Sequence, residues 1–210
     1  MRRFDVERQE MVDLIRSRGV RDERVLAALG RIERHKFVPE PFTGRSYEDS
    51  ALPIGKGQTI SQPYTVALMT EALEAKRGDK VLEVGTGSGY QAAILAELGA
   101  HVFTVERDLA LLASARKLLD TLGYRVASRG GDGTIGWHEH APYDGIIVTA
   151  GAPSVPESLL KQLAEGGRLV IPVGDLEMQR VVIAVRRGET FERREIEGFK
   201  FVPLIGKMGW

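Results

Sequence analysis

The chain has 210 residues, of which 43% are hydrophobic, and its 29 lysines and arginines balance its 29 aspartates and glutamates. The length and apolar content allow one large domain with a substantial core. The balanced charge favours neither nucleic acid nor an anionic membrane as a partner, and the lack of cysteine excludes disulfides, thiol nucleophiles and zinc–thiolate sites. The sequence has no recognisable signal peptide or membrane-spanning run, so we expect a cytoplasmic protein. We also expect it to be a monomer.

Residues 1–78 are predicted to form helices and loops that precede the main sheet. Apolar residues recur at helical spacing in two segments, the first ending at Gly19 and the second starting behind Asp22, a candidate N-cap. Prolines and glycines then interrupt residues 35–64, a pattern typical of a long irregular stretch that serves as a binding loop or lid. A third helix is predicted after Pro63.

Strand and helix patterns alternate through residues 79–210. Five apolar segments are predicted as strands of a parallel sheet: 80–84, 101–106, 125–128, 143–149 and 168–173. Two more strands, 181–186 and 191–196, are predicted to form an antiparallel pair. The pattern predicts an α/β fold with a mostly parallel seven-stranded sheet and helices on both faces. Together with the N-terminal elaboration, it is expected to form a single domain over residues 1–210.

The segment 81–90 (VLEVGTGSGY) is the most informative stretch of the chain. An apolar run containing Glu83 is followed by Gly85, Gly87 and Gly89. Glycine costs backbone entropy on folding, so three at alternate positions indicate a tight turn that something approaches closely. The third glycine comes one residue too early for a dinucleotide fingerprint. With its preceding acidic residue, the turn resembles motif I of S-adenosylmethionine-dependent methyltransferases.

Acidic residues also lie at or after the ends of the next two predicted strands. Glu106 ends one of them and can accept hydrogen bonds from both hydroxyls of a ribose. Asp132 lies between glycines, where it is suited either to bind an adenine amino group or to form a plain surface turn. A cofactor with a ribose and an adenine but no pyrophosphate fits these residues, and S-adenosylmethionine matches that description.

The segment 58–64 places two hydroxyls and two amides just before the third predicted helix. Taken alone, Ser61 is more typical of a turn or a helix N-cap than of a catalytic residue. A nucleophile elbow is absent, and the motif His138-Glu139-His140 has no third ligand. The sequence therefore predicts neither a hydrolase triad nor a metal site.

Taken together, these motifs make the chain similar to the protein-L-isoaspartate (D-aspartate) O-methyltransferase family, and to its bacterial branch more than to its animal branch. The matching stretches are 57–63 (GQTISQP), 81–90, 105–107 (VER), 131–133 (GDG), 141–144 (APYD), 166–174 (GGRLVIPVG) and 201–204 (FVPL). Tyr64, Thr65 and Val66 stand where animal members carry histidines, so contacts made by those histidines are not carried over.

The resemblance implies a Rossmann-like methyltransferase fold, S-adenosylmethionine as cofactor with S-adenosylhomocysteine as product, and no metal. The cofactor contacts that it implies come from Thr59, Ile60, Ser61, Glu83, Gly85, Thr86, Gly87, Gly89, Glu106, Arg107, Asp132 and Gly133. The substrate contacts come from Thr59, Ser61 and Gln62, with Ser61 as the catalytic residue that orients a carboxylate. The acceptor implied is the free α-carboxylate of an L-isoaspartyl residue in damaged proteins, and activity on D-aspartyl residues stays open. The methyl ester would then collapse to a succinimide.

Two other function classes stay open on the sequence. The same cofactor domain could methylate a small molecule or a nucleic acid, although the neutral charge and the lack of an N-P-P-Y motif speak against the latter. The chain could also bind the cofactor as a regulatory module without catalysis, against which the loop around Ser61 speaks. An assay with labelled cofactor and isoaspartyl peptides separates these classes.

Overall fold

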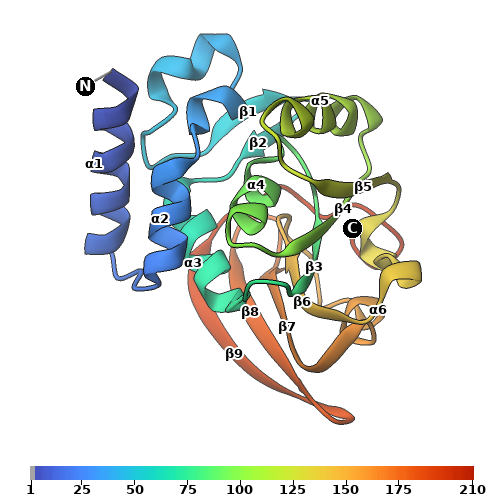
Figure 1. Ribbon diagram of the computed structural model, residues 1–210. Coiled ribbons are helices and arrows are strands. Elements are labelled where there is room, and N and C mark those ends of the chain that lie inside the picture. Colours follow the sequence, from blue (N-terminus) through green and yellow to red (C-terminus); the bar gives the residue numbers. More distant parts are fainter. Residues whose placement is uncertain (1–2) are drawn as a thin grey trace.

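A seven-stranded sheet forms the centre of the computed structural model, which describes residues 3–210 (Figure 1). Its strand order is β5-β4-β3-β6-β7-β8-β9. The strands are β3 (Lys80–Val84), β4 (His101–Glu106), β5 (Val126–Gly130), β6 (Tyr143–Val148), β7 (Leu163–Gly174), β8 (Gln179–Arg187) and β9 (Thr190–Phe199). Strands β3 to β7 are parallel, whereas β8 and β9 are antiparallel to their neighbours. The fold expected from the sequence is therefore confirmed.

Helices cover both faces of this sheet. They are α1 (Arg3–Ser17), α2 (Glu23–Arg31), α3 (Pro63–Leu73), α4 (Tyr90–Glu97), α5 (Leu109–Thr121) and the short α6 (Glu157–Leu160). Val81 of β3 packs into a core shared with α1 to α4, and the next residue, Leu82, packs into a second core with α6. Successive side chains of a strand point to opposite faces, so both faces of β3 are buried. The site-bearing strand is thus held rigidly from two sides.

The helix ends agree with the signals in the sequence. Asp22 caps α2 by accepting a hydrogen bond from the Arg24 amide. Asp108 caps α5 by accepting hydrogen bonds from the amides of Ala110 and Leu111. Such caps satisfy amides that have no partner inside the helix.

The segment 35–64 is more ordered than its sequence predicts. It contains the 3-10 turns η1 (Arg34–Phe37) and η2 (Glu40–Arg45) and an antiparallel hairpin of β1 (Leu52–Gly55) and β2 (Gln58–Ile60). Lys56 and Gly57 form the hairpin turn with φ of 53° and 69°. Two consecutive positive φ values match the twist of antiparallel strands. The expectation of an irregular stretch was wrong here, because Lys-Gly lacks the asparagine or aspartate that usually marks such a turn.

Strand β9 forms one edge of the sheet. Its residues 192–195 are all charged and exposed. Glu192 and Glu195 pair with Arg187 and Arg180 of β8. Charged side chains on an edge strand discourage pairing with another chain.

Two short turns, η3 (Gly133–Ile135) and η4 (His138–His140), connect β5 to β6. Among residues 3–210, none of the helices has the length and apolar character needed to cross a membrane.

Candidate active site

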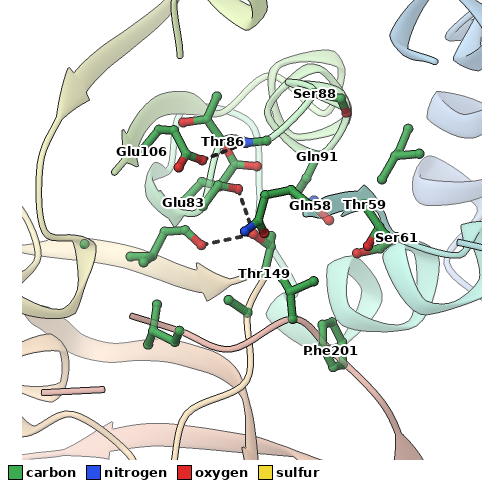
Figure 2. Close-up of a pocket in the computed structure, with 18 of the residues that line it drawn as sticks. Gln58, Thr59, Ser61, Glu83, Thr86, Ser88, Gln91, Glu106, Thr149 and Phe201 are labelled. Carbon is green, nitrogen blue, oxygen red and sulfur yellow. Dashed lines mark hydrogen bonds between the residues drawn. The ribbon is translucent and has the colours of Figure 1, made fainter. Parts of the chain in front are cut away.

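A pocket opens at the carboxyl ends of β3, β4 and β6, where ligands bind in open α/β sheets. Its lining comes from the β1–β2 hairpin with α3, from the ends of these strands and the turns after them, from Gly133 after β5, and from residues 201–205. Figure 2 shows Glu83 and Glu106 on one side of the pocket and Ser61 on the other. Residues distant in the sequence thus meet around one cavity.

The glycine turn after β3 forms the floor of the pocket. Gly85 has a φ of 97°, and a side chain on it would collide with the Thr149 hydroxyl. That hydroxyl donates a hydrogen bond of 2.7 Å to the Gly85 carbonyl, so Thr149 holds the turn from β6. Gly87, with a φ of 52°, lies under Ile54 of the hairpin. Both positions favour glycine for their positive φ, and Gly85 also needs it because Thr149 approaches so closely.

Glu106 is oriented by two backbone amides. Its Oε2 accepts a hydrogen bond from the Gly87 amide at 3.0 Å, and its Oε1 accepts one from the Asp108 amide at 2.9 Å. An ionised carboxylate has about four acceptor positions, so two remain free to face the pocket. Two free acceptors on a fixed carboxylate suit a pair of neighbouring hydroxyls.

Glu83 is fully buried beside the same turn. Its Oε2 accepts a hydrogen bond of 2.5 Å from the Thr104 hydroxyl, which also lies 2.6 Å from the Thr86 hydroxyl. Its Oε1 meets no hydrogen-bond partner among the described residues. Burial, together with the charge of Glu106, raises the pKa of Glu83 to about 8, against the opposing effects of the Thr104 hydroxyl and the Ala92 backbone amide. Near neutral pH the pocket therefore holds a protonated carboxyl with an unused oxygen.

The hairpin supplies the opposite wall. Gln58, Thr59, Ile60 and Ser61 all line the pocket, and Ile60 is anchored in the core by its buried side chain. Asp49 fixes the chain just beyond them, because its Oδ1 accepts a hydrogen bond from the Tyr64 amide at 2.9 Å. The strand pairing and this bond hold Ser61 at the pocket edge.

The structure brings ten of the sequence-predicted site residues together in the pocket lining. They are Thr59, Ile60, Ser61, Glu83, Gly85, Thr86, Gly87, Glu106, Arg107 and Gly133. Gly133 has no room for a side chain, because a Cβ there would collide with Val84.

Three predicted residues lie outside the lining. Gly89 starts α4 with a φ of 86° and packs against Leu119 of α5. Gln62 donates a hydrogen bond to Asp49 at 3.0 Å. Asp132 accepts hydrogen bonds from the amides of Thr134 and Lys207. Direct contacts of these three with cofactor or substrate stay predictions.

Sequence reasoning missed other lining residues, notably Gln58, Thr149 and Phe201. Thr149 follows directly after β6, so the rule that ligands bind at strand ends points to it. Phe201 has no such positional signal, because its segment has neither helical nor strand periodicity; only the family resemblance of residues 201–204 points to it. The described residues also contain no group of three or more histidine, aspartate or glutamate side chains placed to hold a metal.

Comparison with known proteins agrees with this geometry. The family model of protein-L-isoaspartate(D-aspartate) O-methyltransferase matches residues 6–209. The protein-L-isoaspartate O-methyltransferase of Chlorobaculum tepidum is 56% identical over 97% of this chain and 96% of its own length. That of Methanoregula boonei is 55% identical over 97% of this chain and 95% of its own.

Solved structures give the same picture. A protein-L-isoaspartate O-methyltransferase superposes with a TM-score of 0.87 and 30% identity, covering 96% of this chain and 67% of its own. A second protein, from Plasmodium falciparum and titled as a putative enzyme of this kind in complex with S-adenosyl-L-homocysteine, superposes with a TM-score of 0.81. Its 24% identity, over 94% of this chain and 98% of its own, adds support for the fold. The chain belongs to the protein-L-isoaspartate (D-aspartate) O-methyltransferase family.

Proposed function

We propose that this enzyme transfers the methyl group of S-adenosylmethionine to the free α-carboxylate of L-isoaspartyl residues in damaged proteins and peptides. The observation that carries the proposal is the position of Ser61 across the pocket from Glu106 and the glycine turn (Figure 2). One wall is suited to the cofactor and the other presents hydroxyls and amides to an acceptor. The methyl ester formed can collapse to a succinimide, which begins repair.

The residues present fit this cofactor. Glu106 offers two free acceptor positions for the ribose hydroxyls, and the glycine turn leaves room for close approach of the amino-acid part. The unused Oε1 of Glu83 can accept a hydrogen bond from a donor in the pocket. When bound, S-adenosylmethionine supplies an electrophilic methyl group that an oxygen nucleophile takes in one displacement, leaving S-adenosylhomocysteine.

The chain contributes alignment to this reaction. The nucleophile is a carboxylate of the substrate, already ionised at neutral pH, so no protein base has to remove a proton. Ser61 donates a hydrogen bond that orients the carboxylate, while Thr59 and Ile60 shape the wall between acceptor and cofactor. Holding two reactants in line is itself a large source of rate enhancement.

An assay with labelled S-adenosylmethionine tests the function. Matched peptides that differ only in an L-isoaspartyl, L-aspartyl or D-aspartyl residue are incubated with the protein, and methyl ester is measured. We expect strong labelling of the isoaspartyl peptide, weak labelling of the D-aspartyl peptide and none of the aspartyl peptide. Equal labelling of the isoaspartyl and aspartyl peptides, or no labelling of either, would contradict the proposed function.

Replacement of Ser61 tests its role. We expect Ser61→Ala to lower turnover by about tenfold or more, because an oriented hydrogen bond to a charged group is lost. Affinity for S-adenosylhomocysteine, measured by calorimetry, should stay within about twofold of wild type. A matching collapse of that affinity would assign Ser61 to the cofactor instead.

The enzyme is also proposed to work as a cytoplasmic monomer without nucleic-acid or membrane partners. The balanced charge of the chain supports the lack of a polyanionic partner. Light scattering during gel filtration and fractionation of the source cells test these points. A dimer mass, or enrichment in the membrane fraction, would contradict them.

A further inference from the structure

Arg34, the first residue of η1, has a fully buried side chain. Arginine is almost never fully buried unless its charge is paired. The Nη1 of Arg34 meets no hydrogen-bond partner among the described residues. Burial of a charge with an unpaired donor costs stability, so stability alone does not account for an arginine at this position.

The other two nitrogens of Arg34 hold the segment 46–50, which connects η2 to the β1–β2 hairpin. The Nε donates a hydrogen bond of 2.7 Å to the Ser46 carbonyl, and the Nη2 donates one of 3.4 Å to the Ser50 carbonyl. A guanidinium is planar and presents several donors in a fixed arrangement. One side chain therefore restrains both ends of this segment.

Asp49 lies between the two restrained ends and connects the segment to the pocket. It accepts hydrogen bonds from the Gln62 side chain at 3.0 Å and from the Tyr64 amide at 2.9 Å. Both partners follow Ser61 closely in the chain. Burial lowers the pKa of Arg34, and the charge of Asp49 is among the effects that oppose this shift, so the two groups also interact electrostatically.

The same guanidinium packs against the cofactor side of the pocket. Its Cζ lies 5.0 Å from the centre of the Tyr90 ring, within the range of a cation–π interaction. Tyr90 is buried, lines the pocket and begins α4 directly after the glycine turn. Arg34 thus joins the start of α4 to the segment that carries Asp49.

We propose that Arg34 is a positioning residue that fixes Asp49, and through it Ser61, relative to the glycine turn. The inference rests on the proposed function in taking Ser61 as part of the acceptor wall. Arg34 lies outside the pocket lining, so it acts through the segment 46–50 and not by contact with a reactant. Methyl transfer needs the acceptor oxygen in line with the methyl group, so a small displacement of Ser61 lowers the rate.

The variant Arg34→Met tests this role. Methionine keeps a long apolar side chain against the Tyr90 ring but loses the charge and the donors. We expect kcat/KM for an isoaspartyl peptide to fall by about tenfold or more. Affinity for S-adenosylhomocysteine, measured by calorimetry, should change by less than about threefold, because the Tyr90 ring stays packed. Arg34→Lys keeps the charge and a donor, so its kcat/KM should lie between those of the wild type and Arg34→Met.

Hydrogen exchange at the Tyr64 amide measures the same link without any substrate. It should accelerate in Arg34→Met, because the Asp49 carboxylate that accepts from this amide is no longer held in place. Exchange at the Gly87 amide, which donates to Glu106, should stay unchanged and so separates a local effect from global loss of stability. If the wild type methylates no isoaspartyl peptide, the proposed function fails, whereas the exchange rates still decide this inference.

The matched control is Arg31→Met. It makes the same substitution at an arginine with a half-exposed side chain, where it removes an ion pair with Glu97. We expect it to change neither kcat/KM nor exchange at the Tyr64 amide. Each variant is assayed well below its melting temperature, and Arg34→Lys carries the same readouts if Arg34→Met does not fold.

A double-mutant cycle of Arg34→Met and Asp49→Ala tests the route of the effect. If Arg34 acts through Asp49, the double variant loses no more kcat/KM than the more impaired single variant. Additive losses, or an unchanged exchange rate at the Tyr64 amide, would overturn the inference. A loss of S-adenosylhomocysteine affinity as large as the loss of kcat/KM would also overturn it, because Arg34 would then support the cofactor side instead.

Discussion

Glu83 is a carboxyl group held entirely away from solvent. It is fully buried, its pKa is raised to about 8, and one of its oxygens meets no partner among the described residues. A buried carboxylate is costly unless it is paired, so the group stays protonated until the pH exceeds its pKa or a donor reaches it. Its charge state therefore links the stability of the ligand-free protein to pH.

The sign of this link follows from the two pKa values. The pKa of Glu83 in the folded protein lies above the ordinary 4.5 of the unfolded chain. The folded state binds the proton more tightly, so this group's contribution to stability is fully present below about pH 4.5 and is lost as the pH rises toward 8. Glu83→Gln should thus raise the melting temperature of the ligand-free protein at pH 9 and much less at pH 6. An equal effect at both pH values would contradict the assignment.

The second prediction at the scale of single residues concerns Glu106. Glu106→Ala removes the acceptors for two backbone amides and for the ribose, so binding of S-adenosylhomocysteine should weaken by at least ~1.5 kcal/mol, about tenfold. Isothermal titration calorimetry measures this change in the dissociation constant of S-adenosylhomocysteine. Glu139→Ala, which removes an exposed carboxylate outside the pocket lining, is the matched control. An unchanged dissociation constant for Glu106→Ala would rule out the ribose role.

Individual site residues were predictable from the sequence where a polar side chain lies at or near the end of a predicted strand. Glu83 and Glu106 could be found because each lies at or near the end of an apolar strand. Asp132 was harder, because its partner Lys207 is 75 residues away and lies in a segment without periodicity. The sequence shows an aspartate between glycines but not the amide that approaches it.

At the scale of elements, the segment between η2 and the hairpin supports the wall that we propose faces the acceptor. Asp49 contacts Arg18, Gln62 and the Tyr64 amide, and its side chain is only 10% exposed. One carboxylate thus ties α1's end to the start of α3, directly beside Ser61. Loss of a buried acceptor leaves its donors unsatisfied.

We therefore expect Asp49→Ala to lower kcat/KM for an isoaspartyl peptide by about tenfold or more, through the loosened Ser61 segment. Affinity for S-adenosylhomocysteine should fall less, because the glycine turn and Glu106 do not depend on Asp49. Asp49→Asn keeps an oxygen for the Tyr64 amide, so its kcat/KM should lie between those of the wild type and Asp49→Ala. If the affinity for S-adenosylhomocysteine falls as much as kcat/KM does, Asp49 supports the whole pocket instead.

The strands and helices were predicted from the sequence because their patterns are local. Apolar runs predicted β3, β4 and β6, and Asp22 marked the start of α2. The hairpin was missed because its turn depends on the positive φ of Lys56, which a lysine does not signal. Residues 201–205 could not be assigned to the pocket wall from the sequence, because their pairing partner Gly151 lies far away in the chain.

On the scale of the whole molecule, the first 78 residues and the sheet share a core. Side chains of α1, α2 and α3 pack in the same buried cluster as strand residues such as Val81 and Val181. We propose that the chain is a single domain that unfolds as one cooperative unit. Scanning calorimetry should give one transition with a calorimetric enthalpy near the van't Hoff enthalpy.

The melting temperature should also be independent of protein concentration, as expected for a monomer. Two separable transitions would instead mean that residues 1–78 form an independent unit. A melting temperature that rises with concentration would point to an oligomer.

Strand β9 leaves the sheet with an open edge in an enzyme whose substrates are damaged polypeptides. Flexible chains of that kind readily add to an exposed strand through main-chain hydrogen bonds. The four consecutive charged residues at 192–195 make such addition unfavourable, because an incoming apolar segment would lie against solvated charges. We therefore expect a substrate chain to reach the pocket without being captured at this edge as an additional strand.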